Sequence, residues 1–191
     1  MTADLVEIPG YIAGTWVIDP VHSSVGFSVR HLMVARVRGR FTDFSGEIVT
    51  AEDPLRSTVT ASIATASVDT GNADRDAHLR TADFLETDRY PTIAFRSTGV
   101  RPDGEAFALD GELTIKDVTR PVTLSLELGG FGPDYYLKDP SQGARAGFTA
   151  TGRIDRLDFG VGDEGTVASG AVVLAHAIDI TLDIEAVLKT N

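Results

Sequence analysis

The sequence predicts a single all-β domain, an antiparallel β-barrel with one or two short helices. Apolar and polar residues alternate with a period of two along many segments, which is typical of strands with one buried face. A chain of 191 residues is long enough to bury a full core. No internal repeat, low-complexity tract or linker divides it. We therefore expect residues 1–191 to form one domain, with residues 1–14 as an N-terminal extension.

The C-terminal segment shows the alternation most clearly. From Leu174 to Leu188 the even positions are apolar except for His176, and most odd positions from Asp179 to Lys189 are polar. A helix would spread this pattern around its circumference, so the segment is a strand. About a dozen residues at roughly 3.3 Å each would reach about 40 Å, which is beyond the usual strand length. We therefore expect a last strand near residues 171–188 in a tall barrel.

Shorter segments with the same alternation recur along the rest of the chain. Their apolar positions lie in the ranges 25–29, 41–48, 59–63, 93–95, 107–115, 122–128 and 148–154. Many strands with polar outer faces and turns between them predict a barrel or a sandwich.

Two segments break the alternation. In residues 72–85, Asn72 is a candidate N-cap, and the residues after it favour a short helix near 74–82 that lies over a barrel end. Residues 31–38 are either helical or an irregular crossing. Because Leu32, Met33 and Val34 are apolar in succession, we expect that segment to be buried on most sides.

Composition limits the classes of partner. The net charge of −11 opposes sequence-independent binding to nucleic acids and to anionic membrane surfaces. No run of about 18 apolar residues is present, so no helix is expected to span a membrane. The first residues include Asp4 and Glu7 and lack the basic start of a secretory signal, so we expect a cytoplasmic location. There is no cysteine, which excludes disulfides and thiolate chemistry.

Four histidines are the obvious candidates for a metal site. His22, His31, His78 and His176 show no close ligand spacing, such as an i, i+4 pair on a helix. Distant histidines can still meet in a barrel. We favour a simpler interpretation for His22 and His78, a hydrogen bond to a neighbouring carboxylate that closes a barrel end, and we expect no metal.

The residue types of a hydrolase triad occur together at Asp19, His22 and Ser23. Five consecutive positions cannot readily place an acid behind the base and a nucleophile before it. The chain also lacks a G-x-S-x-G elbow. We therefore expect no catalytic residue, and nothing in the sequence indicates a cofactor.

A set of phrases, in a fixed order along the chain, carries a resemblance to a known family. The phrases are Trp16–Pro20, His22–Ser24, Phe27–Met33, Val37–Gly39 with Phe41, Val68–Thr70, Arg75–Leu79, Asp83–Phe84, Tyr90–Ile93 with Phe95, Gly111–Ile115, Val118–Val122, and Arg153–Ile154 with Asp158–Gly160. Together they resemble the YceI-like family of polyisoprenoid-binding proteins, from about Thr15 to about Leu188. One departure is Asp117, where many relatives have glycine, and aspartate tolerates a left-handed turn.

The resemblance implies an eight-stranded, lipocalin-like barrel around a long apolar tunnel. Family members hold a polyisoprenoid or an isoprenoid quinone there, and some pair as homodimers. The function this implies is storage or transport of a long isoprenoid lipid by a non-enzymatic protein. Two alternatives stay open: a metal- or His-dependent enzyme that acts on such a lipid, and a structural scaffold whose barrel is filled.

The tunnel would be lined by inward-facing residues of the alternating segments. These candidates are Val25, Phe27, Val29, Phe41, Phe44, Ile63, Phe95, Leu113, Leu124, Leu126, Phe148, Ile180 and Leu182. The simplest interpretation of the phenylalanines is core packing, because a closed eight-stranded barrel can be filled by its own side chains. Small inward candidates favour a cavity, namely Gly26, Ala61, Ala150 and Gly152.

Four residues are candidates to meet a polar ligand head group at the tunnel mouth: Arg30, Arg38, Arg75 and His78. Guanidinium donors suit phosphate oxygens and can also donate to the carbonyl of a quinone. The alternative for Arg75 is a network with Asp76 that pins the short helix to the barrel.

Overall fold

The computed structural model describes residues 8–164 and 173–190. Its strands are β1 Gly14–Ile18, β2 Ser24–His31, β3 Ala35–Phe41, β4 Phe44–Thr50, β5 Thr58–Ala64, β6 Val68–Asp69, β7 Thr92–Asp103, β8 Ala106–Ile115, β9 Val118–Pro133, β10 Ala144–Asp155 and β11 Leu174–Leu188. The helices are α1 Ala73–Leu79 and the 3-10 turns η1 Pro54–Arg56, η2 Thr65–Ser67, η3 Pro140–Gln142 and η4 Arg156–Phe159.

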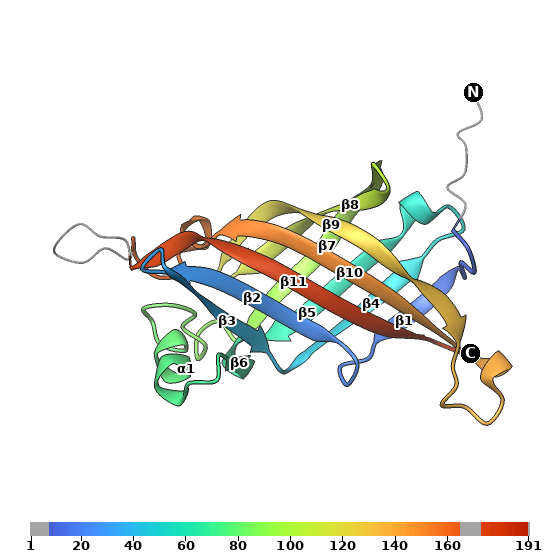
Figure 1. Ribbon diagram of the computed structural model, residues 1–191, viewed down its shortest axis with the longest axis horizontal. Coiled ribbons are helices and arrows are strands. Elements are labelled where there is room, and N and C mark those ends of the chain that lie inside the picture. The colour runs from blue at the N-terminus through green and yellow to red at the C-terminus, as the bar shows by residue number, and fades with distance from the viewer. Residues whose placement is uncertain (1–7, 165–172, 191) are drawn as a thin grey trace.

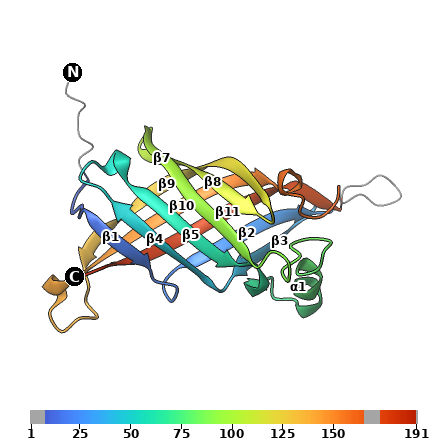
Figure 2. The ribbon, with the colours of Figure 1, turned by 180° about the vertical axis from the view of Figure 1, so that it is seen from behind.

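All strands join one antiparallel sheet that closes into a barrel (Figures 1 and 2). β1 and β2 both pair with β11, through Trp16 opposite Leu188 and Val25 opposite Leu182. β1 and β2 therefore form one interrupted strand of the barrel. β3 and β4 form a second interrupted strand, and β5 and β6 form a third. The barrel therefore has eight strands, as predicted, and three of them are interrupted.

The long last strand is confirmed in β11, which has 15 residues. Residues 171–172 of the predicted range lie outside the described residues. At the N-terminus, β1 begins at Gly14. None of the helices in the described residues has the length and apolar character that a membrane crossing requires.

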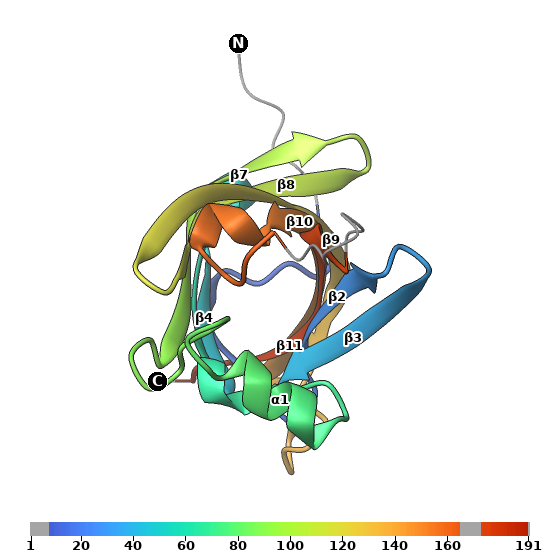
Figure 3. The same cartoon turned by 90° about the vertical axis from the view of Figure 1, so that its left-hand side faces the viewer.

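The predicted helix is present as α1, at the end of the barrel that faces the viewer in Figure 3. Asn72 caps it by accepting a hydrogen bond from the backbone N–H of Arg75 at 2.9 Å. The helix ends at Leu79, earlier than predicted, because Arg80 turns away to bind backbone carbonyls of the η2–β6 segment. A helix prediction from local residues does not include such a tertiary contact.

Thr70 links α1 to the barrel. Buried Asp76 accepts hydrogen bonds from the backbone N–H and the hydroxyl of Thr70, at 2.9 and 2.6 Å. Arg75 donates to the hydroxyl and the carbonyl oxygen of the same threonine, at 2.7 and 3.0 Å. The expected pinning of the helix is thus present, but it runs through Thr70 and not through a direct Arg75–Asp76 pair.

The expectation for residues 31–38 was wrong. His31 ends β2, residues 32–34 form the tight turn, and residues 35–38 begin β3. In the turn, Leu32, Met33 and Val34 are 48%, 52% and 84% exposed. The turn projects past the end of the sheet, so no other strand of the described residues covers it (Figure 3). An apolar run in sequence does not show whether another segment packs on it.

Trp16 stabilises the half of the barrel that lies away from α1 (Figure 1). Its side chain is fully buried among Ala144, Ala146 and Ala186, whose small side chains leave room for the indole. The indole N–H donates to the hydroxyl of Thr50 at 2.7 Å, and that hydroxyl donates to the carbonyl oxygen of Ile12 at 2.7 Å. Burial and a satisfied polar atom together fix β1 against β4.

Replacing Trp16 with alanine should lower the free energy of unfolding by about 3–5 kcal/mol. The substitution leaves a large cavity and removes the indole N–H that donates to the hydroxyl of Thr50. Chemical denaturation followed by circular dichroism measures this. Val21→Ala is the control, since Val21 is 81% exposed and its loss should change stability by less than about 0.5 kcal/mol. A cost below about 1 kcal/mol for Trp16→Ala would contradict this role.

Candidate ligand cavity

The barrel encloses one continuous cavity of about 650 Å³. Its wall includes Tyr11 and Phe131 toward one end and Arg75 and His78 toward the α1 end. Most of the other lining residues are aliphatic or aromatic. The volume lies in the range of roughly 300–1,000 Å³ that is typical of ligand pockets. The interior can therefore take a slim apolar ligand.

Every residue proposed from the sequence for the tunnel borders this cavity. They are Val25, Phe27, Val29, Phe41, Phe44, Ile63, Phe95, Leu113, Leu124, Leu126, Phe148, Ile180 and Leu182. The reason is the strand period of two, which puts alternate residues on the inner face of every strand.

Two glycines make room for phenylalanine rings against the wall of the cavity. Phe27 lies opposite Gly39 in the β2–β3 register, and its ring occupies the place that a Cβ of Gly39 would take. The ring of Phe95 lies over Gly111 in the same way, on the neighbouring strand β8. Rings that lie against the wall use little of the barrel's cross-section. This arrangement explains how a barrel rich in phenylalanine stays hollow.

The small residues named from the sequence have mixed roles. Gly26, Ala61 and Ala150 line the cavity. Gly152 does not, because the side chain of Leu124 packs on it. The recesses at Gly39 and Gly111 were missed. The signal that could have found them is a glycine at an inward position beside a phenylalanine on the next strand, which requires the register.

Polar residues gather at the α1 end of the cavity. Arg75 and His78 line it, as proposed, but Arg75 is bound to Thr70 and the Nε2 of His78 lies 3.0 Å from a carboxylate oxygen of Asp83. Arg30 and Arg38 do not line it. The alternation of β2 and β3 puts them on the outer face, where both are exposed, so they cannot reach a head group in the cavity.

The sequence analysis missed Arg156, which is 3% exposed and also lines the α1 end. It donates to the backbone carbonyls of Val161, Leu174 and Ala175, at 2.8, 3.3 and 3.0 Å. Burial lowers the pKa of this guanidinium from its ordinary value. No local pattern distinguishes a buried arginine from a surface one, so the sequence carried no signal for it.

The sequence model of the protein family described as YceI-like domain matches residues 16–186 of this chain. The chain belongs to the YceI-like family. Protein YceI of Shigella flexneri is 42% identical over 159 residues, which cover 83% of this chain and 81% of that protein. A UPF0312 protein of Serratia proteamaculans is 41% identical over 180 residues, 93% of this chain and 91% of its own length.

Solved structures share the YceI-like fold. BcnA of Burkholderia cenocepacia superposes with a TM-score of 0.74 at 22% identity, over 88% of this chain and 98% of that one. A domain of Saccharophagus degradans, described as polyisoprenoid-binding, gives a TM-score of 0.67 at 16% identity over 93% and 100%. These likenesses confirm the predicted lipocalin-like barrel.

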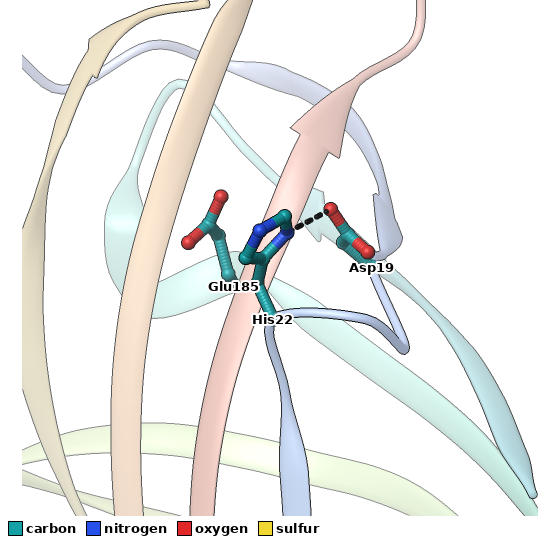
Figure 4. A group of neighbouring side chains, drawn as sticks. All are labelled: Asp19, His22 and Glu185. Atoms are coloured by element: carbon teal, nitrogen blue, oxygen red, sulfur yellow. Dashed lines mark hydrogen bonds and ion pairs between the residues drawn. The ribbon is translucent and has the colours of Figure 1, made fainter.

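A second polar group of this YceI-like barrel lies on its outer surface (Figure 4). One ligand atom each of Asp19, His22 and Glu185 lies within 4.8 Å of the others, a spacing that a metal ion could use. However, Arg145 donates to Asp19 at 2.9 Å, to Asp134 at 3.0 Å and to Glu185 at 2.5 Å. A guanidinium that already neutralises these carboxylates disfavours a cation, so the group is an ion-pair cluster.

The geometry of the same cluster also tests whether Asp19, His22 and Ser23 form a hydrolase triad. Nδ1 of His22 lies 2.9 Å from Asp19, and Nε2 lies 3.3 Å from the hydroxyl of Tyr136. Ser23 donates to the backbone carbonyl of Glu185 and not to His22. The residues thus form no nucleophile–base pair. The carboxylate partners expected for His22 and His78 are confirmed as Asp19 and Asp83.

The cluster makes stability depend on pH. The hydrogen bond with His22, and then the one from Arg145, hold the pKa of Asp19 well below its usual range. A lowered folded-state pKa stabilises the protein above the unfolded value of about 3.9, and this contribution is lost as pH falls further. Asp19→Asn should therefore destabilise the protein by roughly 1.5–3 kcal/mol at neutral pH.

Urea denaturation of both proteins from pH 7 to pH 3 tests this expectation. The stability gap between wild type and Asp19→Asn should narrow below about pH 4. Asp88→Asn is the control, because Asp88 is exposed and should leave the curve unchanged. A gap that stays constant to pH 3 would show that Asp19 acts through packing and not through its charge.

Proposed function

We propose that this protein binds a long-chain isoprenoid lipid in the barrel cavity and stores or transports it. The ligand class is a polyisoprenoid, or an isoprenoid quinone or its precursor. The observation that carries the proposal is the largely apolar cavity, whose two lining arginines, Arg75 and Arg156, lie at the α1 end. The Saccharophagus degradans domain of the same fold, described as polyisoprenoid-binding, supports it.

Burial of the tail supplies most of the affinity in this proposal. Each methylene removed from water contributes about 0.8 kcal/mol, so a tail of about twenty carbons could gain on the order of 15 kcal/mol. Ordering the chain and losing its free motion offset a large part of that gain. Binding can therefore be tight without a charged contact.

The distribution of polar groups gives the ligand a direction. The head group would lie at the α1 end beside Arg75, His78 and Arg156, and the tail would extend toward Tyr11 and Phe131. Each of these three side chains already has hydrogen-bond partners within the protein. Their contribution to head-group binding is therefore small compared with that of the tail.

We favour binding over catalysis because the Asp19–His22–Glu185 group, the one set of three metal-type ligands in the described residues, lies outside the cavity. An enzyme acting on a lipid in the barrel would need its reactive groups on the cavity wall. A purely structural scaffold fits the hollow interior poorly, because a filled barrel needs no recesses at Gly39 and Gly111.

Native mass spectrometry of the purified protein, followed by lipid extraction, tests the proposal directly. A co-purifying isoprenoid in a one-to-one complex is the expected result. Stoichiometric metal in the same spectra would favour the enzyme alternative. A protein that neither co-purifies with nor takes up an added isoprenoid would refute the proposal.

Ala150→Phe or Ala61→Phe should exclude long tails but still admit short ones, because both alanines line the cavity. A series of isoprenoid alcohols that differ only in the number of isoprene units measures this. Matched controls are Thr151→Phe and Ser62→Phe, the exposed neighbours on the same strands. Overpacking could cost about 1–3 kcal/mol, so denaturation curves are measured alongside. Affinity for long tails that is unchanged in both cavity variants would place the ligand elsewhere.

Arg75→Ala and His78→Ala should each weaken binding only modestly, by less than about ten-fold, if tail burial dominates. Isothermal titration with one isoprenoid alcohol and with the quinone of equal tail length separates head from tail effects. The opposite pattern, abolished binding in these variants with no dependence on tail length, would make the polar end the whole site.

A further inference from the structure

The turn between β2 and β3, here called the hairpin tip and formed by Leu32, Met33 and Val34, exposes three adjacent apolar side chains. The N–H of Val34 bonds to the carbonyl of His31 at 3.1 Å, and φ is 49° at Leu32 and 57° at Met33. The two central residues of the turn therefore both have a left-handed backbone conformation. Asn-Gly is the pair of residues that such a turn usually favours. Bulky apolar residues in this strained position point to a function.

The charge around the hairpin tip is opposite to that of the protein. The sequence has 28 acidic residues and a net charge of −11, yet residues 20–42 contain four arginines and no acidic residue. Arg36 pairs with Asp179 and Arg40 with Asp69. Arg30 and Arg38 are exposed on the outer face and have no ion pair within the described part of the chain. A local excess of positive charge therefore lies behind the tip.

The hairpin tip belongs to the rim of the cavity. It lies at the same end of the barrel as α1 (Figures 1 and 3). The N–H of Leu32 donates to the carbonyl of Val173 at 2.7 Å, and both Val173 and His31 line the cavity. A surface that contacts the tip is thus adjacent to the polar end of the cavity.

We infer that the hairpin tip docks the protein on an anionic lipid bilayer. Leu32, Met33 and Val34 enter the boundary between head groups and acyl chains, and Arg30 and Arg38 lie against anionic head groups. The overall charge disfavours such a surface, but the local charge favours it in this one orientation. The biological use of docking rests on the proposed function, because it would bring the cavity mouth to a source or acceptor of lipid.

A bilayer fits this surface better than a protein partner does. Three side chains at one turn fall far short of the roughly 800 Å² per partner that a stable protein interface buries. A second copy of the chain would also bring a second net charge of −11 to the contact. Shallow insertion needs only a few apolar side chains with cations behind them.

Co-sedimentation with vesicles tests the inference, using phosphatidylcholine alone and phosphatidylcholine mixed with phosphatidylglycerol. Wild-type protein should bind the mixed vesicles, and binding should weaken as salt is raised. Leu32→Asn combined with Met33→Gly should reduce binding at least ten-fold. This variant supplies the residues that the turn prefers, so it should fold at least as well as wild type.

Arg30→Gln combined with Arg38→Gln should weaken binding to mixed vesicles roughly 25-fold, at about five-fold per arginine, and leave the weak binding to neutral vesicles unchanged. Tyr135→Ser is the control for exposed apolar surface. Tyr135 is 79% exposed and lies between β9 and β10, at the other end of the barrel, so its replacement should have no effect.

Three outcomes would overturn the inference: no binding of wild type to mixed vesicles, equal binding by the Leu32→Asn, Met33→Gly variant, or a dimer in solution that this variant dissociates. Native mass spectrometry and co-sedimentation of the wild-type protein keep the two proposals separate. Isoprenoid bound without vesicle binding would refute docking alone. Vesicle binding by a protein that takes up no isoprenoid would refute the proposed function alone.

Discussion

The closure of the barrel along β11 is the interaction on which the rest of the structure depends. This strand pairs with β10 along one edge and with β2 and then β1 along the other. Its register decides which side chains face inward, since a slip by one residue would turn Asp179 and Asp183 into the lumen in place of Ile180 and Leu182. On the outer face, Asp179 accepts from Arg153 and Arg36, which ties β10, β11 and β3 together.

The inner wall of the cavity could be predicted because alternation is a local property. Residues such as Phe27 and Leu182 face inward for reasons that lie within their own strands. The hollowness of the barrel could not be predicted in the same way. It depends on Phe27 lying over Gly39 and Phe95 over Gly111, which are contacts between neighbouring strands. The identity of the wall was thus readable from the sequence, and its shape was not.

The incorrect expectations share one physical cause, the dependence of burial on distant segments. Leu32 to Val34 resemble a buried run, but within the described part of the chain no strand passes over the turn. Arg30 and Arg38 were assigned to the mouth because of their chemistry, while the strand period directs them outward. Buried Arg156 went unnoticed, since its partners are the backbone carbonyls of Val161, Leu174 and Ala175, which no local pattern links to an arginine. In each case the chemistry of the residue could be read from the sequence, but the segments that surround it in the fold could not.

A cavity that holds its ligand by the tail creates a difficulty of release. Moving each methylene from the barrel into water costs about 0.8 kcal/mol, so a long tail leaves through water very slowly. Transfer becomes fast only if the tail passes from one apolar environment directly into another. The polar residues at the α1 end and the exposed hairpin tip at the same rim fit that requirement. In a chain with a net charge of −11, repulsion would turn other faces away from an anionic bilayer, and the arginines behind the tip would select this end for contact.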